Sequence, residues 1–321
     1  MREPQFHPLH QIDSAALATE AAAGLMQTPA QVSPKFFYDA LGSRLFDAIT
    51  ELAEYYPTRT EAAILARHGG ELAAAVESVL GSGITLVDLG AGNCAKAAGL
   101  FDSLSVARYI AVDISVEFLR QAMSCLQRQH PELEMVGVGL DFSARLAFPS
   151  GLCAGPSLVF YPGSSIGNFN PGEALRLLGE ARALAAGGAL LIGVDLLKSS
   201  ARLEAAYDDD LGVTAAFNLN LLKHLNQLLG SDFEVRDWRH HALFNTGESR
   251  IEMHLESRRE QWVRWRGGQR HFAAGERIHT ESSYKWRAAD FEALLRDAGF
   301  ASVQTWTDEQ GWFALMLALA D

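Results

Sequence analysis

The stretch Ile84–Gly92, ITLVDLGAG, determines the fold of this chain. It opens with a short apolar run that is stopped by glycines, which is the pattern of a buried strand in a parallel sheet. Gly90 and Gly92 would let the backbone approach a ligand closely, because a β-carbon at such a strand-to-helix turn would collide with it. Glycines after a strand often mark nothing more than a tight turn, so the motif needs support from the rest of the chain.

Further apolar runs follow this stretch and alternate with amphipathic helical segments. Val116–Gln129 and Gly172–Ala186 have the helical pattern. Alternating strands and helices predict an α/β fold with a doubly wound parallel sheet. The expected strands are Tyr109–Val112, Leu133–Leu140, Leu158–Phe160 and Ala189–Leu197.

The end of the chain predicts one more helix and an antiparallel hairpin. The helix covers Ala288–Ala298, and the two strands, Ser302–Thr307 and Phe313–Ala320, are joined by a turn at Asp308–Gly311. A terminal hairpin of this kind resembles the one that completes the Rossmann-like sheet of class I methyltransferases. We therefore expect that fold for the segments 62–197 and 287–321.

The remaining segments, 12–61 and 198–286, predict a second, α+β domain that binds the substrate. Ile12–Val76 is helical in pattern, with turn signals at Ser33-Pro34, Gly42-Ser43 and Tyr56-Pro57. After Leu197 the alternation stops. A helix is expected at Val213–Leu229, followed by antiparallel strands at Phe233–Leu243, Arg250–Trp265 and Gln269–Thr280.

Two acidic positions support a nucleoside site next to the glycine turn. Asp113 ends the second expected strand, where it could accept hydrogen bonds from both ribose hydroxyls. Asp141 and Phe142 follow the third strand and could bind and stack on an adenine ring. NAD would satisfy much of this pattern, although Ala95 stands where the dinucleotide fingerprint has its third glycine. The terminal hairpin favours S-adenosylmethionine as the cofactor.

Composition favours a small-molecule substrate. The net charge of −12 and pI near 5.3 oppose binding to nucleic acid or to an anionic membrane surface. Three scattered cysteines suggest no disulfide framework. We expect no signal peptide, because Met1–Gln11 has no basic cluster followed by an apolar run, and no membrane span, because no apolar stretch is long enough. We expect a cytoplasmic monomer without a metal. His240-His241 and His254 are expected to point to different faces of their strands, which disfavours a metal site.

Polar and aromatic residues form dense clusters in the rest of the chain, at Phe37–Asp39, Glu54–Glu61, Gly163–Asn168, Tyr207–Asp210, Arg250–Met253 and Thr280–Lys285. In content and order these clusters resemble those of the histidine-specific methyltransferase family. The best-known members of that family make N-α-trimethylhistidine (hercynine) on the way to ergothioneine. Ala53 departs from the proline usual in the family, and Tyr161-Pro162 from a leucine found in some members, without removing a polar contact.

The resemblance implies a role for each matching side chain. Asn168 would hold the amino and carboxylate groups of histidine, and Tyr38 would position the amine, which makes these two the candidate catalytic residues. Tyr55 and Tyr207 would donate to the carboxylate. The imidazole ring would be bound by Glu281 and Ser283 in a pocket that Met253 narrows. The cofactor residues follow from the strand-end pattern and not from the resemblance: they are Gly90, Gly92, Asp113, Asp141 and Phe142, with Lys96 reaching the donor carboxylate.

Three alternatives remain open from the sequence. The acceptor could be an indole or another aromatic amino acid, as for some relatives of the family. The chain could be a dehydrogenase that binds NAD. It could also be a non-catalytic nucleoside-binding protein, although Asn168, Tyr207 and Asp113 are all present. Lys96 could equally be a solvated helix lysine, and the tyrosines could be packing anchors.

Overall fold

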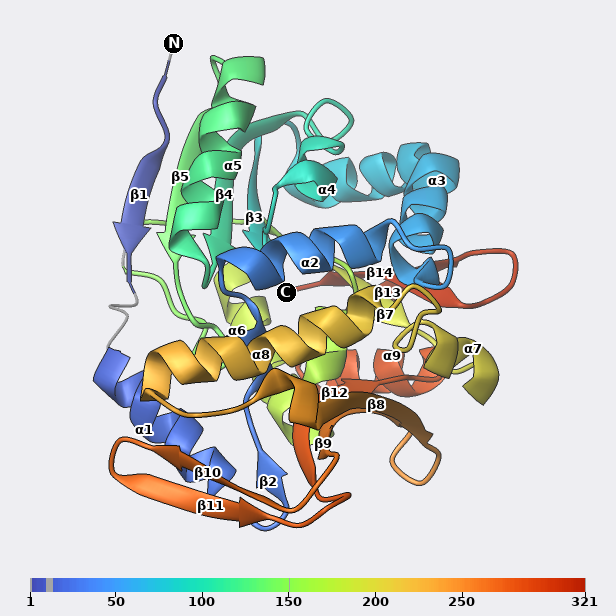
Figure 1. Ribbon diagram of the computed structural model, residues 1–321. Coiled ribbons are helices and arrows are strands. Elements are labelled where there is room, and N and C mark those ends of the chain that lie inside the picture. The colour runs from blue at the N-terminus through green and yellow to red at the C-terminus, as the bar shows by residue number, and fades with distance from the viewer. Residues whose placement is uncertain (1, 10–13, 150, 321) are drawn as a thin grey trace. The chain divides into compact units, whose positions relative to one another are not determined.

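Strand β3 (Ile84–Leu89) lies inside an eight-stranded sheet in the computed structural model, which describes residues 2–9, 14–149 and 151–320 (Figure 1). Its parallel neighbours are β4 (Val106–Asp113) and β6 (Leu158–Tyr161). The strand order is β1-β5-β4-β3-β6-β7-β14-β13, and only the last two strands run antiparallel to their neighbours. The predicted sheet with its terminal hairpin is confirmed. The other bounds are β5 (Glu134–Gly139), β7 (Ala189–Asp195), β13 (Ser302–Thr307) and β14 (Phe313–Leu319).

Helices cover both faces of this sheet, because its strands alternate apolar side chains to either side. Val87 and Leu89 pack into one core with α6 (Pro171–Ala185) and α9 (Ala288–Asp297). Leu86 packs into the core on the other face. Each such buried leucine contributes roughly 1.5–3 kcal/mol relative to exposure. The helices of the second core are α3 (Tyr56–Leu80), α4 (Ala95–Ala98) and α5 (Val116–Gln129).

One strand of the sheet has no counterpart among the predicted ones. Strand β1 (Gln5–Pro8) pairs in parallel with β5 at the edge of the sheet. The sequence analysis missed it because four residues are too few to show a period, and its outer residues are exposed.

The chain forms two compact units. The first comprises Met1–His10, Pro57–Leu197 and Lys285–Asp321, and the second comprises Gln11–Tyr56 and Lys198–Tyr284. The predicted boundaries differ at the junctions, since residues 57–61 and 285–286 belong to the first unit. The predicted start at Ile12 lies outside the described residues. That the second unit binds the substrate stays a prediction.

The second unit contains a four-stranded sheet of order β2-β12-β9-β8 and a separate hairpin, β10-β11. Helix α8 (Val213–Leu229) has the predicted bounds, and it packs on β8 and β9. The strands are β2 (Ala30–Gln31), β8 (Trp238–Asn245), β9 (Arg250–Ser257), β10 (Gln261–Trp265), β11 (Gly268–Phe272) and β12 (Arg277–Tyr284). The other helices are α1 (Ser14–Leu25), η1 (Pro34–Phe37), α2 (Ala40–Thr50), α7 (Ser200–Ala205) and η3 (Val235–Asp237).

The predicted strands of this unit were wrong in their limits. Arg250–Trp265 is two strands, β9 and β10, and Gln269–Thr280 is also two, β11 and β12. Alternation continues across both breaks, so the period alone does not show that the chain changes sheets. Gly275, with φ +81°, marks the second break. The segment Phe233–Leu243 begins with η3, and β8 starts only at Trp238.

The predicted turn at Gly42-Ser43 was also wrong, because both residues lie in the first part of α2. Asp39 caps this helix by accepting a hydrogen bond from the Gly42 N–H at 2.6 Å. A β-carbon at Gly42 would lie 1.7 Å from the Phe37 carbonyl oxygen, so glycine is required for close packing and not for a turn. In the described ranges, no helix combines the length and apolarity needed to cross a membrane.

Candidate active site

The glycine loop after β3 folds back over the end of β4. Gly90 and Ala91 both donate their backbone N–H groups to the Val112 carbonyl oxygen, at 2.9 and 3.0 Å. Gly90 and Gly92 have φ of +70° and +52°, a region that β-carbons disfavour. A β-carbon at Gly90 would lie 3.9 Å from the Phe142 ring, so the torsion angle and not lack of space requires glycine here. This distance also places Phe142 beside the loop.

Asp113 is bound to the same loop. Its Oδ2 accepts the Gly92 N–H at 2.9 Å, and its Oδ1 accepts the Ser115 N–H at 2.8 Å. Burial raises the pKa of Asp113, and these backbone hydrogen bonds oppose that effect. Each carboxylate oxygen has two lone pairs, so a carboxylate held by two N–H groups can still accept from ligand hydroxyls. The structure thus brings the predicted Gly92 and Asp113 together.

Asp141 and Phe142 follow β5 in the same unit. Asp141 Oδ1 accepts hydrogen bonds from the backbone N–H of Ser143 and from its hydroxyl, which fixes the carboxyl group. Phe142 lies edge-on to Tyr161, with ring centroids 5.8 Å apart. Phe142 therefore contacts Tyr161 of β6 and also lies near Gly90 of the glycine loop.

Asp88 has a buried carboxylate oxygen that nothing satisfies among the described residues. The side chain is only 2% exposed; its Oδ2 accepts the Tyr109 hydroxyl at 2.8 Å, and its Oδ1 has no partner. Burial raises the pKa of Asp88 to about 7, against the effect of the Tyr109 hydrogen bond. An orphaned buried acceptor at the end of a parallel strand indicates a ligand that brings its own N–H donors. From the sequence, Asp88 was predicted only as the start of the glycine loop, with no separate role for its side chain.

Lys96, a predicted cofactor residue, forms an ion pair with Glu61. The other oxygen of Glu61 accepts the Gly163 N–H at 2.8 Å. Glu61 is 1% exposed and was part of a recognised sequence cluster, but the sequence analysis assigned it no function. The sequence does not predict this burial, because a glutamate in the second turn of an amphipathic helix is expected on the exposed face.

Asn168 lies in the short helix η2 (Ser165–Asn168) that follows β6, and its side chain is half-buried. The loop before it contains two successive left-handed residues, Gly163 with φ +76° and Ser164 with φ +60°. Ser164 Oγ accepts the Asp195 backbone N–H at 2.8 Å, which attaches this loop to the end of β7. The predicted position of Asn168 after the fourth of the expected strands is confirmed.

In the second unit, three predicted tyrosines belong to one aromatic cluster. Tyr38 and Tyr55 both contact Phe46 edge-on, with centroid distances of 5.8 and 6.3 Å. Tyr55 in turn contacts Tyr207 at 6.4 Å. Tyr38 also lies against Phe217 of α8, at 5.9 Å. These contacts bring together the residues that the resemblance associates with the amino and carboxylate groups.

Tyr207 connects this cluster to the sheet. Its hydroxyl donates to Ser283 Oγ at 2.8 Å, and its carbonyl oxygen lies 2.8 Å from His240 Nε2. His240 Nδ1 is 2.8 Å from the Asn218 amide nitrogen. These partners require His240 to be neutral with the proton on Nε2, and burial lowers its pKa.

A β-bulge decides where the predicted ring-binding residues point. His279 pairs with His254, but Glu281 pairs with Met253, so Thr280 is the extra residue in β12. Directly paired residues of antiparallel strands share a face, and neighbouring residues do not. Glu281 therefore lies on the opposite face from His279, together with Met253 and Ser283. In a regular strand, Glu281 and His279 would share one face.

The bulge gives the four-stranded sheet one buried face, with Met253, Glu281 and Ser283, and one polar face. Met253, Glu281 and Ser283 are 2%, 7% and 4% exposed, respectively. Thr280, fully buried, donates its hydroxyl to the Met253 carbonyl oxygen at 3.0 Å. The structure thus places the predicted Met253, Glu281 and Ser283 side by side and adds Thr280, which the sequence analysis missed because a bulge depends on pairing.

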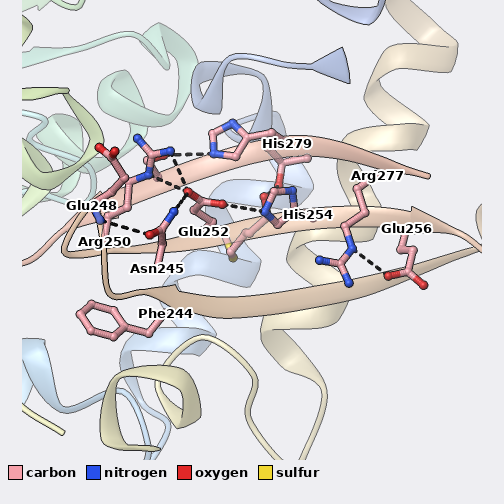
Figure 2. Close-up of polar contacts among 12 residues, drawn as sticks. Phe244, Asn245, Glu248, Arg250, Glu252, His254, Glu256, Arg277 and His279 are labelled. Atoms are coloured by element: carbon pink, nitrogen blue, oxygen red, sulfur yellow. Dashed lines mark hydrogen bonds and ion pairs between the residues drawn. The ribbon is translucent and has the colours of Figure 1, made fainter. Parts of the chain in front are cut away.

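The polar face contains a row of histidines, one on each of β8, β9 and β12. His241 pairs with His254 and His254 with His279. The expectation that His241 and His254 point to different faces was wrong, and only His240 lies on the other face. Figure 2 shows His254 donating towards Glu252, which also accepts from Asn245 and Arg250. Among the described side chains, no His, Cys, Asp or Glu group has the geometry for a metal ion.

Comparison with known proteins gives a consistent result. Residues 17–320 match the family model described as "Histidine-specific methyltransferase, SAM-dependent". The chain is 42% identical to a histidine N-alpha-methyltransferase of Mycolicibacterium smegmatis, over 96% of each chain. It is 41% identical to the Mycobacterium tuberculosis enzyme of the same name, over 94% of each chain. It is also 32% identical to ergothioneine biosynthesis protein 1 of Neurospora crassa, over 87% of this chain and 32% of that one.

The family model covers nearly all of both units, including the glycine loop, Asn168 and the bulged strand β12. This match excludes the two alternative functions, a dehydrogenase and a non-catalytic nucleoside-binding protein. The chain belongs to the histidine-specific, S-adenosylmethionine-dependent methyltransferase family.

Proposed function

We propose that this chain transfers three methyl groups, one after another, from S-adenosylmethionine to the α-amino nitrogen of L-histidine, as a step in ergothioneine biosynthesis. The names of its similar proteins support histidine as the acceptor. The observation that contributes most is the buried group of Met253, Glu281 and Ser283, with Tyr207 bonded to Ser283.

The residues of the first unit fit the donor. The orphaned Asp88 Oδ1 fits the ammonium group of its methionine part, which brings N–H donors. Asp113 fits the ribose hydroxyls, and Asp141 with Phe142 fits the adenine. When bound, S-adenosylmethionine supplies an electrophilic methyl group on a sulfonium.

The ring of histidine explains the polar groups on the buried face of β12. Glu281 would accept from one ring N–H, and Ser283 would donate its hydroxyl to the other ring nitrogen. A substrate without these ring nitrogens would leave buried polar groups unpaired, which costs about 1–3 kcal/mol for each group. Met253 would limit the width of the ring that fits.

The amino and carboxylate groups require separate partners. We assign them to Asn168, with Tyr55 as a hydroxyl donor to the carboxylate and Tyr38 positioning the amine. Tyr207 would be the second donor, and its hydroxyl proton would turn from Ser283 to the carboxylate when histidine binds. The acceptor nitrogen must be the unprotonated amine, since an ammonium has no lone pair. Binding has to release this proton and hold the lone pair towards the methyl group, so alignment supplies most of the rate enhancement.

The test combines the purified chain, L-histidine and an excess of S-adenosylmethionine, with products measured by mass spectrometry. A mass gain of three methyl groups is expected; no methylated product at saturating donor would overturn the proposal. A panel with tryptophan and other aromatic amino acids tests the acceptor. Glu281→Ala should relax the preference for histidine over the panel, whereas Glu260→Ala, an exposed glutamate of the same unit, should leave the preference unchanged.

We further propose that the chain acts in the cytoplasm as a monomer, on small molecules, without a metal and without a nucleic-acid or membrane partner. The net charge of −12 supports the exclusion of polyanionic partners. Sedimentation velocity measures the oligomeric state, and activity in the presence of a chelator tests the absence of a metal.

A further inference from the structure

Glu61 is a charged side chain inside the first unit, and both of its oxygens have a partner. It belongs to α3, is 1% exposed, and forms an ion pair with Lys96 through Oε2. Its Oε1 accepts the Gly163 N–H at 2.8 Å. Glutamate is almost never this buried unless it is paired, and the two partners come from different segments of the chain. The arrangement therefore calls for a reason beyond packing.

The space around Glu61 is adapted to its carboxylate. A β-carbon at Gly193 of β7 would lie 2.3 Å from Glu61 Oε1, so the strand leaves room for the carboxylate by having glycine. A β-carbon at Gly163 would lie 3.1 Å from Lys96 Nζ. Glu61, Lys96 and Gly163 thus form a closed triangle of contacts, in which each of the three is next to the other two.

The two partners of Glu61 lie next to the two parts of the proposed site, namely the glycine loop and the loop before Asn168. Lys96 lies in α4, directly after the glycine loop that holds the donor. Gly163 begins the loop that ends in Asn168, and its left-handed φ of +76° is followed by another at Ser164. Ser164, which is not a glycine, keeps such a conformation only where its surroundings support it. Its Oγ accepts the Asp195 N–H, and Glu61 binds the neighbouring Gly163 N–H, so both residues of the turn are tied to the rest of the unit.

The charges of this triangle also act on Asp88. Lys96 favours the ionised form of the Asp88 carboxyl, and Glu61 disfavours it. Both groups are therefore within electrostatic range of the orphaned Asp88 oxygen. The Glu61 charge neutralises Lys96 and so keeps an unpaired cation away from the site where the donor ammonium is proposed to bind.

We propose that Glu61 is a positioning residue of the methyl transfer: it holds Lys96 and the Gly163 amide in one arrangement, so that the donor loop and the Asn168 loop are set together. The effect on the Asn168 loop rests on the proposed function. The effect on donor binding rests only on membership in the S-adenosylmethionine-dependent family.

The test uses Glu61→Gln, which keeps an acceptor for the Gly163 N–H but removes the charge that pairs with Lys96. Binding of S-adenosylhomocysteine is measured by calorimetry without histidine, together with the melting temperature and the KM and kcat for both substrates. We expect donor-product affinity to fall about tenfold, equivalent to about 1.4 kcal/mol, and KM for the donor to rise. An unchanged affinity, with or without a lower melting temperature, would overturn the proposal, because a purely structural role predicts that result.

Glu180→Gln is the matched control. Glu180 has the same two kinds of partner in the same unit, since its Oε2 accepts the Leu146 N–H at 2.7 Å and its Oε1 pairs with Arg176 at 2.9 Å. It lies on α6, and these two partners are Leu146 and Arg176, neither of which belongs to the glycine loop. This variant should bind S-adenosylhomocysteine within about twofold of the parent chain, a difference below the roughly 1.4 kcal/mol of a tenfold effect.

Glu61→Gln leaves the Lys96 ammonium without its ion-pair partner, which could impair folding. The double variant with Lys96→Gln removes that unpaired charge, so a double-mutant cycle of the two substitutions keeps the proposal testable. If Glu61 acts through Lys96, then Glu61→Gln should have little further effect on affinity in the Lys96→Gln background. Fully additive losses would contradict the proposal. The binding measurement contains no histidine, so it does not depend on the proposed acceptor. If the chain bound S-adenosylhomocysteine but did not methylate histidine in the separate activity assay, the proposed acceptor would be refuted and the inference about Glu61 would still hold.

Discussion

Asp88, the penultimate residue of the buried strand β3, has one oxygen bonded to Tyr109 and the other without a partner among the described residues. A carboxyl group in this state is costly unless a ligand supplies a donor. A buried acceptor without a donor indicates which chemical group a ligand would bring. The glycine motif indicates only that a ligand could approach the backbone.

The raised pKa of Asp88, about 7, predicts how donor binding depends on pH. If the ionised form accepts the ligand ammonium, affinity should rise with pH through about 7 and fall below it. Between pH 8 and pH 6 the ionised fraction of such a group drops about tenfold, so the Kd for S-adenosylhomocysteine should rise by a similar factor. Calorimetry at several pH values measures this. Asp88→Asn should bind weakly and without the pH dependence; a variant that retains the dependence would assign it to another group.

Gly42 shows how a residue can be required by one contact. Gly42→Ala would place a β-carbon 1.7 Å from the Phe37 carbonyl oxygen, so we expect a loss of roughly 1–3 kcal/mol or more in the free energy of unfolding. Gly69→Ala is the control, because no atom lies within 4 Å of its β-carbon position in helix α3. That variant should be stabilised by about 0.5–1 kcal/mol. Denaturant unfolding of both variants measures the difference, and equal stabilities would contradict it.

At the scale of elements, the bulge in β12 has the largest consequence. It places Glu281 and Ser283 on the buried face with Met253, and leaves His279 on the polar face with His254. β-Bulges commonly occur beside active sites, where they redirect a side chain. Here the redirected side chain is the one proposed to bind the imidazole ring.

Thr280→Val should therefore weaken histidine binding without affecting donor binding. The substitution removes the buried hydroxyl that donates to the Met253 carbonyl oxygen, at a cost of about 1–3 kcal/mol for the group left unsatisfied. We expect KM for histidine to rise while the Kd of S-adenosylhomocysteine stays constant. Thr19→Val, which removes a hydroxyl bonded to a carbonyl in exposed α1, should change neither value. An unchanged histidine KM in Thr280→Val would show that the bulge does not depend on this bond.

At the scale of the whole molecule, buried histidines make the second unit sensitive to acid. The second unit contains four histidines whose pKa values are lowered mainly by burial, namely His240, His241, His254 and His279. For His254 the pKa falls to about 4, by burial and then by the charge of His279. Glu252, its partner, has a pKa lowered to about 2 despite the opposing effect of burial, through its bonds to Asn245 and Arg250.

These shifts predict that the second unit loses stability as the pH falls from about 6.5 towards about 4. In that range histidines of the unfolded chain, with a pKa near 6.5, bind protons that the folded chain does not bind, so the free energy of unfolding rises with pH. Thermal unfolding from pH 4.5 to 8 should show this slope and a plateau above neutrality. His254→Gln should reduce the slope. His271→Gln, on the half-exposed histidine of hairpin β10-β11, is the control, and an equal reduction there would refute the assignment.

Elements whose pattern and end signals lie within one segment could be predicted from the sequence. The bounds of α5, α8 and β13 agree with those predicted, because a helical or strand period and its end signals lie within one segment. The strands after α8 were joined incorrectly, because alternation continues through the points where the chain changes from one sheet to another. The functional residues were found by motif and resemblance, and their assigned roles stay predictions.

The sequence by itself determined the alternating strands and helices, the glycine turn after β3, and the family. These follow from torsion preferences and apolar periods, which neighbouring residues set among themselves. Only the tertiary structure decided that Glu61 joins Lys96 and Gly163, which lie 35 and 102 positions away along the chain. It also decided that Thr280 turns Glu281 to the buried face, because the register of a strand is a property of its pairing with another strand.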